Sequence, residues 1–470
     1  MKSYAIVGAG YTGLSVLAQL LEHAKGDVAS ITLFDVPEKL AVGTAFAEDV
    51  STNLLNRPVN SMYFRERGDF GAWLARHDPK APVTDSAFLP RARFGQFLCH
   101  QLRECQQQAA SLGIELNIVP QRVIDVFSLE TCLRVQTEDG TDRFYHRCFL
   151  CLGTATSHDP YGLRHQPGYY DSVWPVSCLD ITRDDCVAII GSRLSAHDAA
   201  IALASKCRKI YFLSRKGALP RQIEGYCDIT PQAFTTDEID RLLVAHGRIT
   251  VAQLFRLLRR EFNAHHCSLS QFIQHADPGV TAMSILLALN NTVSYAWRKL
   301  SEHQRQHFIL RWQPRWQQLR IPIASPNAEK IAALFRSGKL EHLHGDIAIT
   351  PRRQGFTIAV PGREPIVASK VINASGISSA PASYPLAQRL VQRGMACEHP
   401  FGGIRVCSDS LCLQDVAGRT VSGIKCIGQL TVGDYYAVGN IDVLHSQARQ
   451  AVISGWHDTP LAECAQGEER

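Results

Sequence analysis

No stretch of this sequence is apolar over the roughly 18 residues that a membrane-spanning helix requires. The sequence also lacks a strong charge of either sign, because 49 basic residues nearly balance 44 acidic ones and leave a net charge of +5. A balance this mild argues against a nucleic-acid partner and against binding to a membrane surface. The first apolar run begins at Tyr4, which leaves no room for a signal peptide, and we therefore expect a cytoplasmic protein.

Metal-ligand spacings and Ser-His-Asp arrangements are also missing, so we expect no metal site. The 15 cysteines include one CxxC pair, Cys148 and Cys151, in the apolar segment HRCFLCLG. A thioredoxin-like redox pair sits at the start of a helix, whereas positions three apart on a strand point to opposite faces. We therefore expect free buried thiols in a reducing compartment.

What the sequence does have is a glycine-rich turn near its start. An apolar run from Tyr4 leads into Gly8-x-Gly10-x-x-Gly13, and a helical pattern follows. A dinucleotide pyrophosphate needs this order of strand, turn and helix, because the helix N-terminus offers free N–H groups to the anion. The next apolar run ends on Asp35, where a ribose hydroxyl needs an acceptor. We predict an adenine dinucleotide, either FAD or NAD, with the contacts Gly8, Gly10, Tyr11, Thr12, Gly13 and Asp35.

Two further segments fit the surroundings of such a cofactor. The loop 51–64 follows the second predicted strand and carries the polar candidates Asn53, Asn56, Arg57 and Ser61. Much later an apolar strand ends at Gly428-Gln429, before a glycine-broken loop that runs into a helix at about Asn440. A strand end before a helix N-terminus is a place for an anionic or polar cofactor group.

A second strand, turn and helix begins at Val187, with the candidate contacts Gly191, Ser192, Arg193 and Ser195. Here the middle glycine is replaced by Arg193, which either presents its guanidinium to a phosphate or blocks the site. The strand after it ends in Ser214-Arg215-Lys216. Basic residues beside a hydroxyl suit a 2′-phosphate, so this end of the strand favours NADP over NAD.

The chain is long enough for about three domain-sized units. From Arg221 to about Phe335 the pattern changes to long helices, and we expect them to frame a cleft. We predict an α/β fold with two Rossmann-like dinucleotide-binding domains, the second inserted in the first. The predicted bounds are 1–180 for the first part of the FAD domain, 181–345 for the NADPH domain with a helical insertion at about 222–335, and 346–470 for the rest of the FAD domain.

This arrangement resembles the flavoproteins with two dinucleotide-binding domains, and the resemblance covers nearly the whole chain. Within them the chain is similar to a bacterial FAD/NAD(P)-binding group related to flavin-dependent ornithine and lysine N-hydroxylases. The matching stretches are Leu54-Leu55-Asn56 with Pro58 and Met62, Pro90-Arg91 before Phe94-Gly95, Ser214-Arg215-Lys216-Gly217, and Trp316 with Arg320 and Pro322. In N-hydroxylases an acid and a tyrosine stand where this chain has Lys370 and Ile377.

The resemblance implies FAD and NADPH as cofactors. It also implies that the Asn56–Met62 loop lies along the isoalloxazine and that Gly428 meets the ribityl and pyrophosphate side. It adds Leu55, Met62, Gly153, Thr154 and Gly376 to the cofactor-binding candidates.

We therefore expect a monooxygenase that passes oxygen from O₂ to a small molecule, with an amine among the candidate substrates. Tyr435, Tyr436 and Asn440 are the candidate walls of a substrate pocket that excludes water. One alternative is an FAD oxidase or dehydrogenase that does not use NADPH, and another is a flavin-binding protein with a non-catalytic role. The oligomeric state stays open.

Overall fold

The computed structural model describes residues 2–23, 26–79, 83–156, 159–274 and 279–454. Its largest sheet has six strands, in the order β20-β21-β7-β1-β2-β3. All neighbours are parallel except β20 and β21. The strands are β1 (Lys2–Val7), β2 (Val28–Phe34), β3 (Glu115–Val119), β7 (Arg147–Leu150), β20 (Cys412–Gln414) and β21 (Thr420–Cys426).

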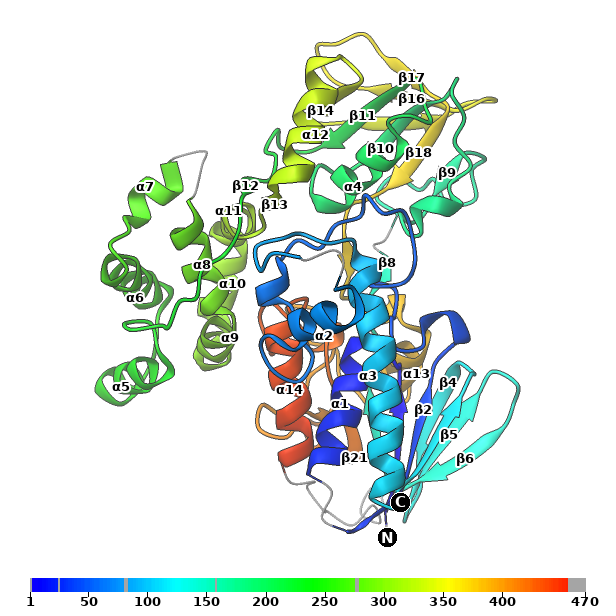
Figure 1. The fold of residues 1–470 in the computed structure, drawn as a ribbon, viewed down its shortest axis with the longest axis vertical. Coiled ribbons are helices and arrows are strands. Elements are labelled where there is room, and N and C mark those ends of the chain that lie inside the picture. Colours follow the sequence, from blue (N-terminus) through cyan, green and yellow to red (C-terminus); the bar gives the residue numbers. More distant parts are fainter. Residues whose placement is uncertain (1, 24–25, 80–82, 157–158, 275–278, 455–470) are drawn as a thin grey trace, which may run out of the picture.

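Helices α1, α3 and α14 lie side by side along this sheet (Figure 1), and α1 contacts both of the others. Since both faces of a parallel sheet are covered, its central strands are almost entirely apolar, as in the buried YAIV of β1. The bounds in this domain are α1 (Tyr11–Glu22), α2 (Asp69–His77), α3 (Arg91–Ser111), α13 (Pro385–Gln392) and α14 (Ile441–Ile453), with an antiparallel meander of β4 (Val123–Ser128), β5 (Leu133–Thr137) and β6 (Asp142–Tyr145).

A second, five-stranded parallel sheet has the order β14-β11-β10-β18-β9. It is packed against α4 (Leu194–Leu203) and α12 (Ser325–Arg336), and lies above the first sheet in Figure 1. Its strands are β9 (Tyr169–Tyr170), β10 (Cys186–Ile190), β11 (Lys209–Ser214), β14 (Leu340–His344) and β18 (Lys370–Asn373), and an antiparallel unit of β15 (Ala348–Pro351), β16 (Phe356–Ala359) and β17 (Ile366–Ala368) covers its other face. The predicted α/β fold with a second Rossmann-like sheet is confirmed.

The chain passes between the two sheets twice, and the two crossings pair with each other. β8 (Ala155–Thr156) runs antiparallel to β19 (Ile377–Ser378). The predicted return to the first domain at residue 346 is therefore too early, and the departure at 180 too late. β18 lies within the range 346–470 predicted for the FAD domain, but its backbone pairs with β10 of the second sheet.

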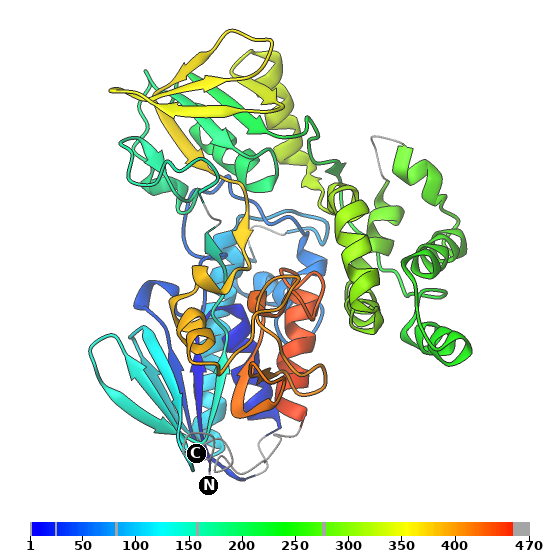
Figure 2. The same ribbon diagram turned by 180° about the vertical axis from the view of Figure 1, so that it is seen from behind.

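Helices α5 to α11 form a separate helical unit between β12 and β13, well to one side of both sheets (Figures 1 and 2). It has its own apolar core and lies within the predicted insertion at about 222–335, but α12, at the end of that range, packs against the second sheet. α10 ends at Arg311, and Pro314 lies in the first turn of the next helix, where a proline is tolerated. The bounds are β12 (Gln222–Ile223), α5 (Thr236–His246), α6 (Val251–Ala264), α7 (Leu269–Gln274), α8 (Val280–Ala288), α9 (Asn290–Lys299), α10 (Glu302–Arg311), α11 (Gln313–Arg320) and β13 (Ile323–Ala324).

Two further sequence expectations can be compared with the fold. Cys148 lies within β7 and Cys151 directly after it, both are free, and burial raises the pKa of both thiols. They are therefore the buried thiols that the strand pattern predicts. Across the described parts of the chain, no helix combines the length and the apolar character needed to cross a membrane.

Candidate active site

The first glycine turn has no room for side chains. Gly8 adopts a φ of +94°, and a Cβ there would lie 2.1 Å from the Cys151 carbonyl oxygen. A Cβ on Gly13 would lie 1.9 Å from the Gly8 carbonyl oxygen, and one on Gly10 would lie 3.1 Å from the Cα of Gly43. The strand, the turn and the helix can pack this closely only because all three positions are glycine.

The N-terminus of α1 is built to receive an anion. The first bond along the helix runs from the Leu14 N–H to the Gly10 carbonyl oxygen at 2.9 Å, so the N–H groups of Tyr11, Thr12 and Gly13 point out of the helix end. The first turn contains no acidic residue. These groups fit the pyrophosphate of a dinucleotide. The Tyr11 side chain takes no part, since it is buried and its hydroxyl donates to the Tyr63 carbonyl oxygen at 3.2 Å.

Asp35 closes the turn from the end of β2. Its carboxylate accepts a hydrogen bond from the Ala9 N–H at 2.8 Å and another from the Val36 N–H at 2.9 Å. Burial raises the pKa of Asp35, although both backbone bonds oppose that shift. A carboxylate fixed in this way can accept a further hydrogen bond from a ribose hydroxyl.

Gly428 lies beside the same helix end. A Cβ at this position, where φ is +93°, would be 3.9 Å from the Thr12 hydroxyl oxygen. The Gly428 N–H donates to Gln447 Oε1 at 3.0 Å, which ties the end of β21 to α14. The structure thus brings together Thr12 and Gly428, two predicted cofactor contacts of the first domain that more than 400 residues separate in the chain.

A cavity of about 490 Å³ opens where the two sheets and the helical unit meet. Seven segments line it: the loop 51–64, the start of α4, the segment after β12, helices α8, α9 and α11 with the residues that follow α11, the return crossing, the segment around residue 401, and the loop 429–440. The lining residues are Asn56, Arg57, Arg193, Tyr226, Met283, Leu286, Leu287, Asn290, Gln313, Gln317, Arg320, Ile321, Pro322, Ile377, Ser379, Phe401, Gln429, Val432, Tyr436, Ala437, Val438, Gly439 and Asn440.

Only part of the predicted loop 51–64 reaches this cavity. Asn56 and Arg57 line it, whereas Leu55 and Met62 are buried in the core of the first domain. The Ser61 hydroxyl is buried as well and donates to the Pro58 carbonyl oxygen at 3.0 Å. The loop is therefore held by Leu55, Met62 and Ser61, and it presents Asn56 and Arg57 to the cavity.

Asn53 lies in the same loop but does not line the cavity. Its amide donates to Asp49 at 2.9 Å. Its Oδ1 is buried and has no hydrogen-bond partner among the described residues. This oxygen is free to accept from a bound group.

A buried carboxylate, Asp442 in the first turn of α14, holds three parts of the site together. It accepts hydrogen bonds from Arg57 at 3.0 Å, from the Tyr63 hydroxyl at 2.9 Å and from the Asn290 amide at 3.0 Å. Burial acts to raise the pKa of Asp442, but the Arg57 guanidinium and these hydrogen bonds outweigh it and lower the pKa. The first domain and the helical unit are thereby fixed around a charged pair whose members are each 7% exposed.

The second glycine turn keeps one of its three glycines. Gly191 has a φ of +122°, and a Cβ there would lie 2.5 Å from the Ala374 carbonyl oxygen. Ser192 is buried and its hydroxyl donates to the Ala218 carbonyl oxygen at 3.3 Å, while Ser195 lies in the first turn of α4. Arg193 extends away from the turn, where its guanidinium donates to Gln317 Oε1 of α11 at 3.1 Å and lines the cavity.

Basic residues surround the end of β11, as the predicted 2′-phosphate site requires. The Ser214 hydroxyl donates to the Lys216 carbonyl oxygen at 2.8 Å and lies 2.7 Å from His342 Nε2. Arg215 and Lys216 are exposed, and His344 follows His342 on the neighbouring strand β14. The assignment of this cluster to the 2′-phosphate of NADPH stays a prediction.

The remaining predicted residues divide between the cavity and other places. Tyr436, Asn440 and Gln429 line the cavity. Tyr435 points the other way, and its hydroxyl donates to the Ser408 carbonyl oxygen at 3.0 Å. Gly153 and Thr154 are exposed just before the first crossing, and Gly376 just before the second, so these three lie at the connections between the domains.

Polar residues of the helical unit were missed as site residues. Gln313, Gln317 and Arg320 line the cavity from α11, and Asn290 and Tyr226 line it from nearby. A signal was present, because positions 313, 317 and 320 are four and three apart and share one face of a helix. That face is polar where a core-facing stripe would be apolar.

Comparisons with known proteins agree with this geometry. Residues 5–155 match the model of the FAD-NAD(P)-binding family. A curated relative, the uncharacterized protein YdhS of Escherichia coli strain K12, is 24% identical over an alignment of 335 residues, and the match covers 63% of this chain and 59% of the relative. The match thus spans less than two thirds of that protein.

Solved structures share the fold over nearly the whole chain. Ornithine hydroxylase PvdA of Pseudomonas aeruginosa has a TM-score of 0.61 at 13% identity, over 96% of this chain and 98% of that chain. A flavin-containing monooxygenase of Stenotrophomonas maltophilia has a TM-score of 0.52 at 15% identity, again over 96% and 98%. Residues 5–155 of this chain therefore match the FAD-NAD(P)-binding family model, which supports FAD and NAD(P) as cofactors, and the two-sheet fold is similar to that of the two monooxygenase structures.

Proposed function

We propose that this protein is an FAD-dependent, NADPH-using monooxygenase, similar to the N-hydroxylases, that acts on a small molecule, with amines as the first class to test. One observation carries the proposal. The cavity of about 490 Å³ is lined at once by Asn56 and Arg57 of the first domain and by Arg193 of the second glycine turn. A nicotinamide and an isoalloxazine that enter from these two sides meet in one cavity.

The residues of this chain supply binding, orientation and exclusion of water. FAD, when bound, supplies electron transfer from NADPH and the activation of O₂. The N–H groups of residues 11–13 bind its pyrophosphate, and Asp35 orients a ribose. Ser214, Arg215 and Lys216 hold the 2′-phosphate of NADPH.

Part of the cavity wall is apolar. Met283 and Leu286 of α8 and Tyr436 contribute this part. Asp442 fixes the loop that carries Arg57 against the helical unit through Asn290. A reactive oxygen species survives long enough to meet a substrate only where water is excluded.

An FAD oxidase or dehydrogenase that does not use NADPH is the second candidate, and Arg193 is the observation that favours it. This residue replaces the glycine that lets the protein backbone come close to the pyrophosphate of a dinucleotide. Its bond to Gln317 turns the guanidinium toward the cavity, but its Cβ still stands in the turn.

Mixing the anaerobic holoprotein with NADPH separates the two candidates. In a monooxygenase of the proposed kind, NADPH reduces the flavin and its main visible absorption band disappears. When air is then admitted, the protein consumes O₂ faster in the presence of its substrate than in its absence. A panel of amines under air then identifies the acceptor. If NADPH leaves the flavin oxidised while another small molecule reduces it, the second candidate holds. If nothing reduces it, the flavin has a non-catalytic role.

A further inference from the structure

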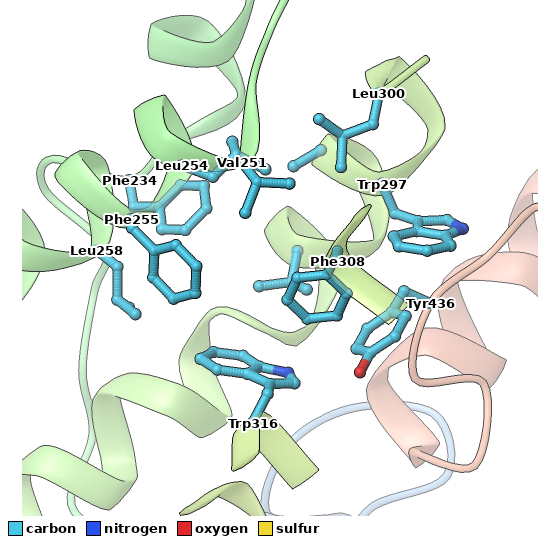
Figure 3. A pocket seen from close by; sticks show the side chains of 12 residues that line it. Phe234, Val251, Leu254, Phe255, Leu258, Trp297, Leu300, Phe308, Trp316 and Tyr436 are labelled. Carbon is cyan, nitrogen blue, oxygen red and sulfur yellow. The ribbon is translucent and has the colours of Figure 1, made fainter. Parts of the chain in front are cut away.

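A small apolar chamber of about 60 Å³ lies inside the helical unit, next to the larger cavity. Its walls come mainly from α6, α9, α10 and α11, and the rings of Phe255, Phe308 and Trp316 face into it (Figure 3). Among the described residues, Tyr436 alone lines both spaces. It therefore forms part of the wall between the larger cavity and the chamber.

The chamber contains one polar group that a ligand would satisfy. Trp316 is 9% exposed, and its indole nitrogen is buried with no hydrogen-bond partner among the described residues. In Figure 3 this nitrogen lies on the side of the ring toward Tyr436. By contrast, the indole nitrogen of Trp297 donates to the Gly433 carbonyl oxygen at 2.8 Å. A buried N–H without a partner costs free energy, which an acceptor on a bound molecule would recover.

The larger cavity is positively charged where it adjoins the chamber. No Asp or Glu lines the cavity among the described residues. Arg193 donates to the neutral amide of Gln317, and Arg320 to the neutral amide of Asn290. Asp442, the acid that lies behind the wall, already pairs with Arg57. Arg193 and Arg320 line the larger cavity together with Tyr436.

From these observations, and resting on the proposed FAD-dependent monooxygenase function but not on an amine substrate, we propose that the substrate is a small carboxylic acid with a short apolar tail. Its carboxylate binds Arg320 and Arg193 in the larger cavity, and its tail passes Tyr436 into the chamber. An oxygen atom on the tail accepts a hydrogen bond from the Trp316 N–H. Guanidinium groups whose contacts are neutral amides have donors to spare for a carboxylate, and an apolar hollow of this size takes only a few carbon atoms.

The test is a titration of the holoprotein in the absence of NADPH, so that no turnover occurs. Binding is measured by calorimetry and by the shift in melting temperature. The ligands are straight-chain acids from acetate to octanoate, together with methyl esters and primary amines of the same chain lengths. We expect the acids to bind and the esters and amines to bind at least tenfold more weakly. Affinity for the acids should rise about fourfold for each added methylene and stop rising once the chamber is full.

Three variants and a control locate the ligand. Arg320→Gln should weaken acid binding at least tenfold, whereas Arg315→Gln, an exposed residue of the same helix, should change it less than twofold. Ala296→Leu fills the chamber and should remove the dependence on chain length while acetate still binds. A keto group on the tail should improve binding to the native protein, and Trp316→Phe should abolish that gain.

Equal binding of acids and amines, or affinity independent of the tail in the native protein, would overturn the inference. So would an Arg320→Gln variant that loses affinity for NADP⁺ but not for the acids, because the arginine would then serve a cofactor phosphate. The proposed function is judged separately, by reduction of the flavin with NADPH. A protein that passes that test and ignores the acids retains its function and loses only this substrate assignment.

Discussion

Gly13→Ala should yield a protein that is purified without its flavin. The new Cβ would lie 1.9 Å from the Gly8 carbonyl oxygen and 3.2 Å from Cγ2 of Ile6, a fully buried residue. Since the first of these atoms is backbone, the turn itself must open, and the N–H groups at the start of α1 move away from the pyrophosphate. We expect FAD affinity to fall at least a hundredfold and stability to fall by up to about 3 kcal/mol. Flavin content per chain and the melting temperature measure the two effects.

Gly71→Ala is the matched control. Gly71 also lies in a helix, α2, but a Cβ there would meet only Cγ1 of Val59, at an ordinary 3.6 Å. Alanine is favoured over glycine in a helix by about 1 kcal/mol, so this variant should keep its FAD and unfold at the same or a slightly higher temperature. A Gly13→Ala protein with full flavin content would show that the turn does not hold the cofactor.

Replacing both Arg215 and Lys216 by alanine should raise the KM for NADPH roughly 10- to 100-fold while changing that for NADH less than about threefold. A hydrogen bond to a charged group contributes about 1.5–3 kcal/mol, and only NADPH carries the phosphate that these side chains would bind. Steady-state reduction of the flavin with each nucleotide measures the ratio.

The control removes the same charge from the other end of the strand. Lys206 and Arg208 are exposed residues just before β11, so their double alanine variant changes the net charge equally but leaves the predicted phosphate site intact. It should use both nucleotides as the native protein does. Equal losses with NADPH and NADH in the Arg215 and Lys216 variant would remove the 2′-phosphate assignment.

The parts of the site that could be predicted from the sequence are those fixed by short-range geometry. The three glycines of the first turn are separated by two and three positions, and each is required by contacts within one strand, one turn and one helix. The same applies to the second turn at Gly191. Local backbone constraints of this kind leave direct traces in the residue types.

The parts that could not be predicted depend on long-range packing. Nothing in the residues Lys370–Asn373 says which of two parallel sheets the strand joins, because both offer an apolar neighbour. Tyr435 and Tyr436 are adjacent and chemically identical, yet one bonds to Ser408 and the other lines the cavity. The polar face of α11 could not be assigned to the site from the sequence, because only the fold places it next to Arg193.

The central claim is that the first glycine turn binds FAD, and the visible absorption spectrum of the purified protein tests it most directly. We predict a yellow protein with the two-banded spectrum of an oxidised flavin, and release of about one FAD per chain on denaturation. A folded protein that is colourless and takes up no added FAD would contradict the account.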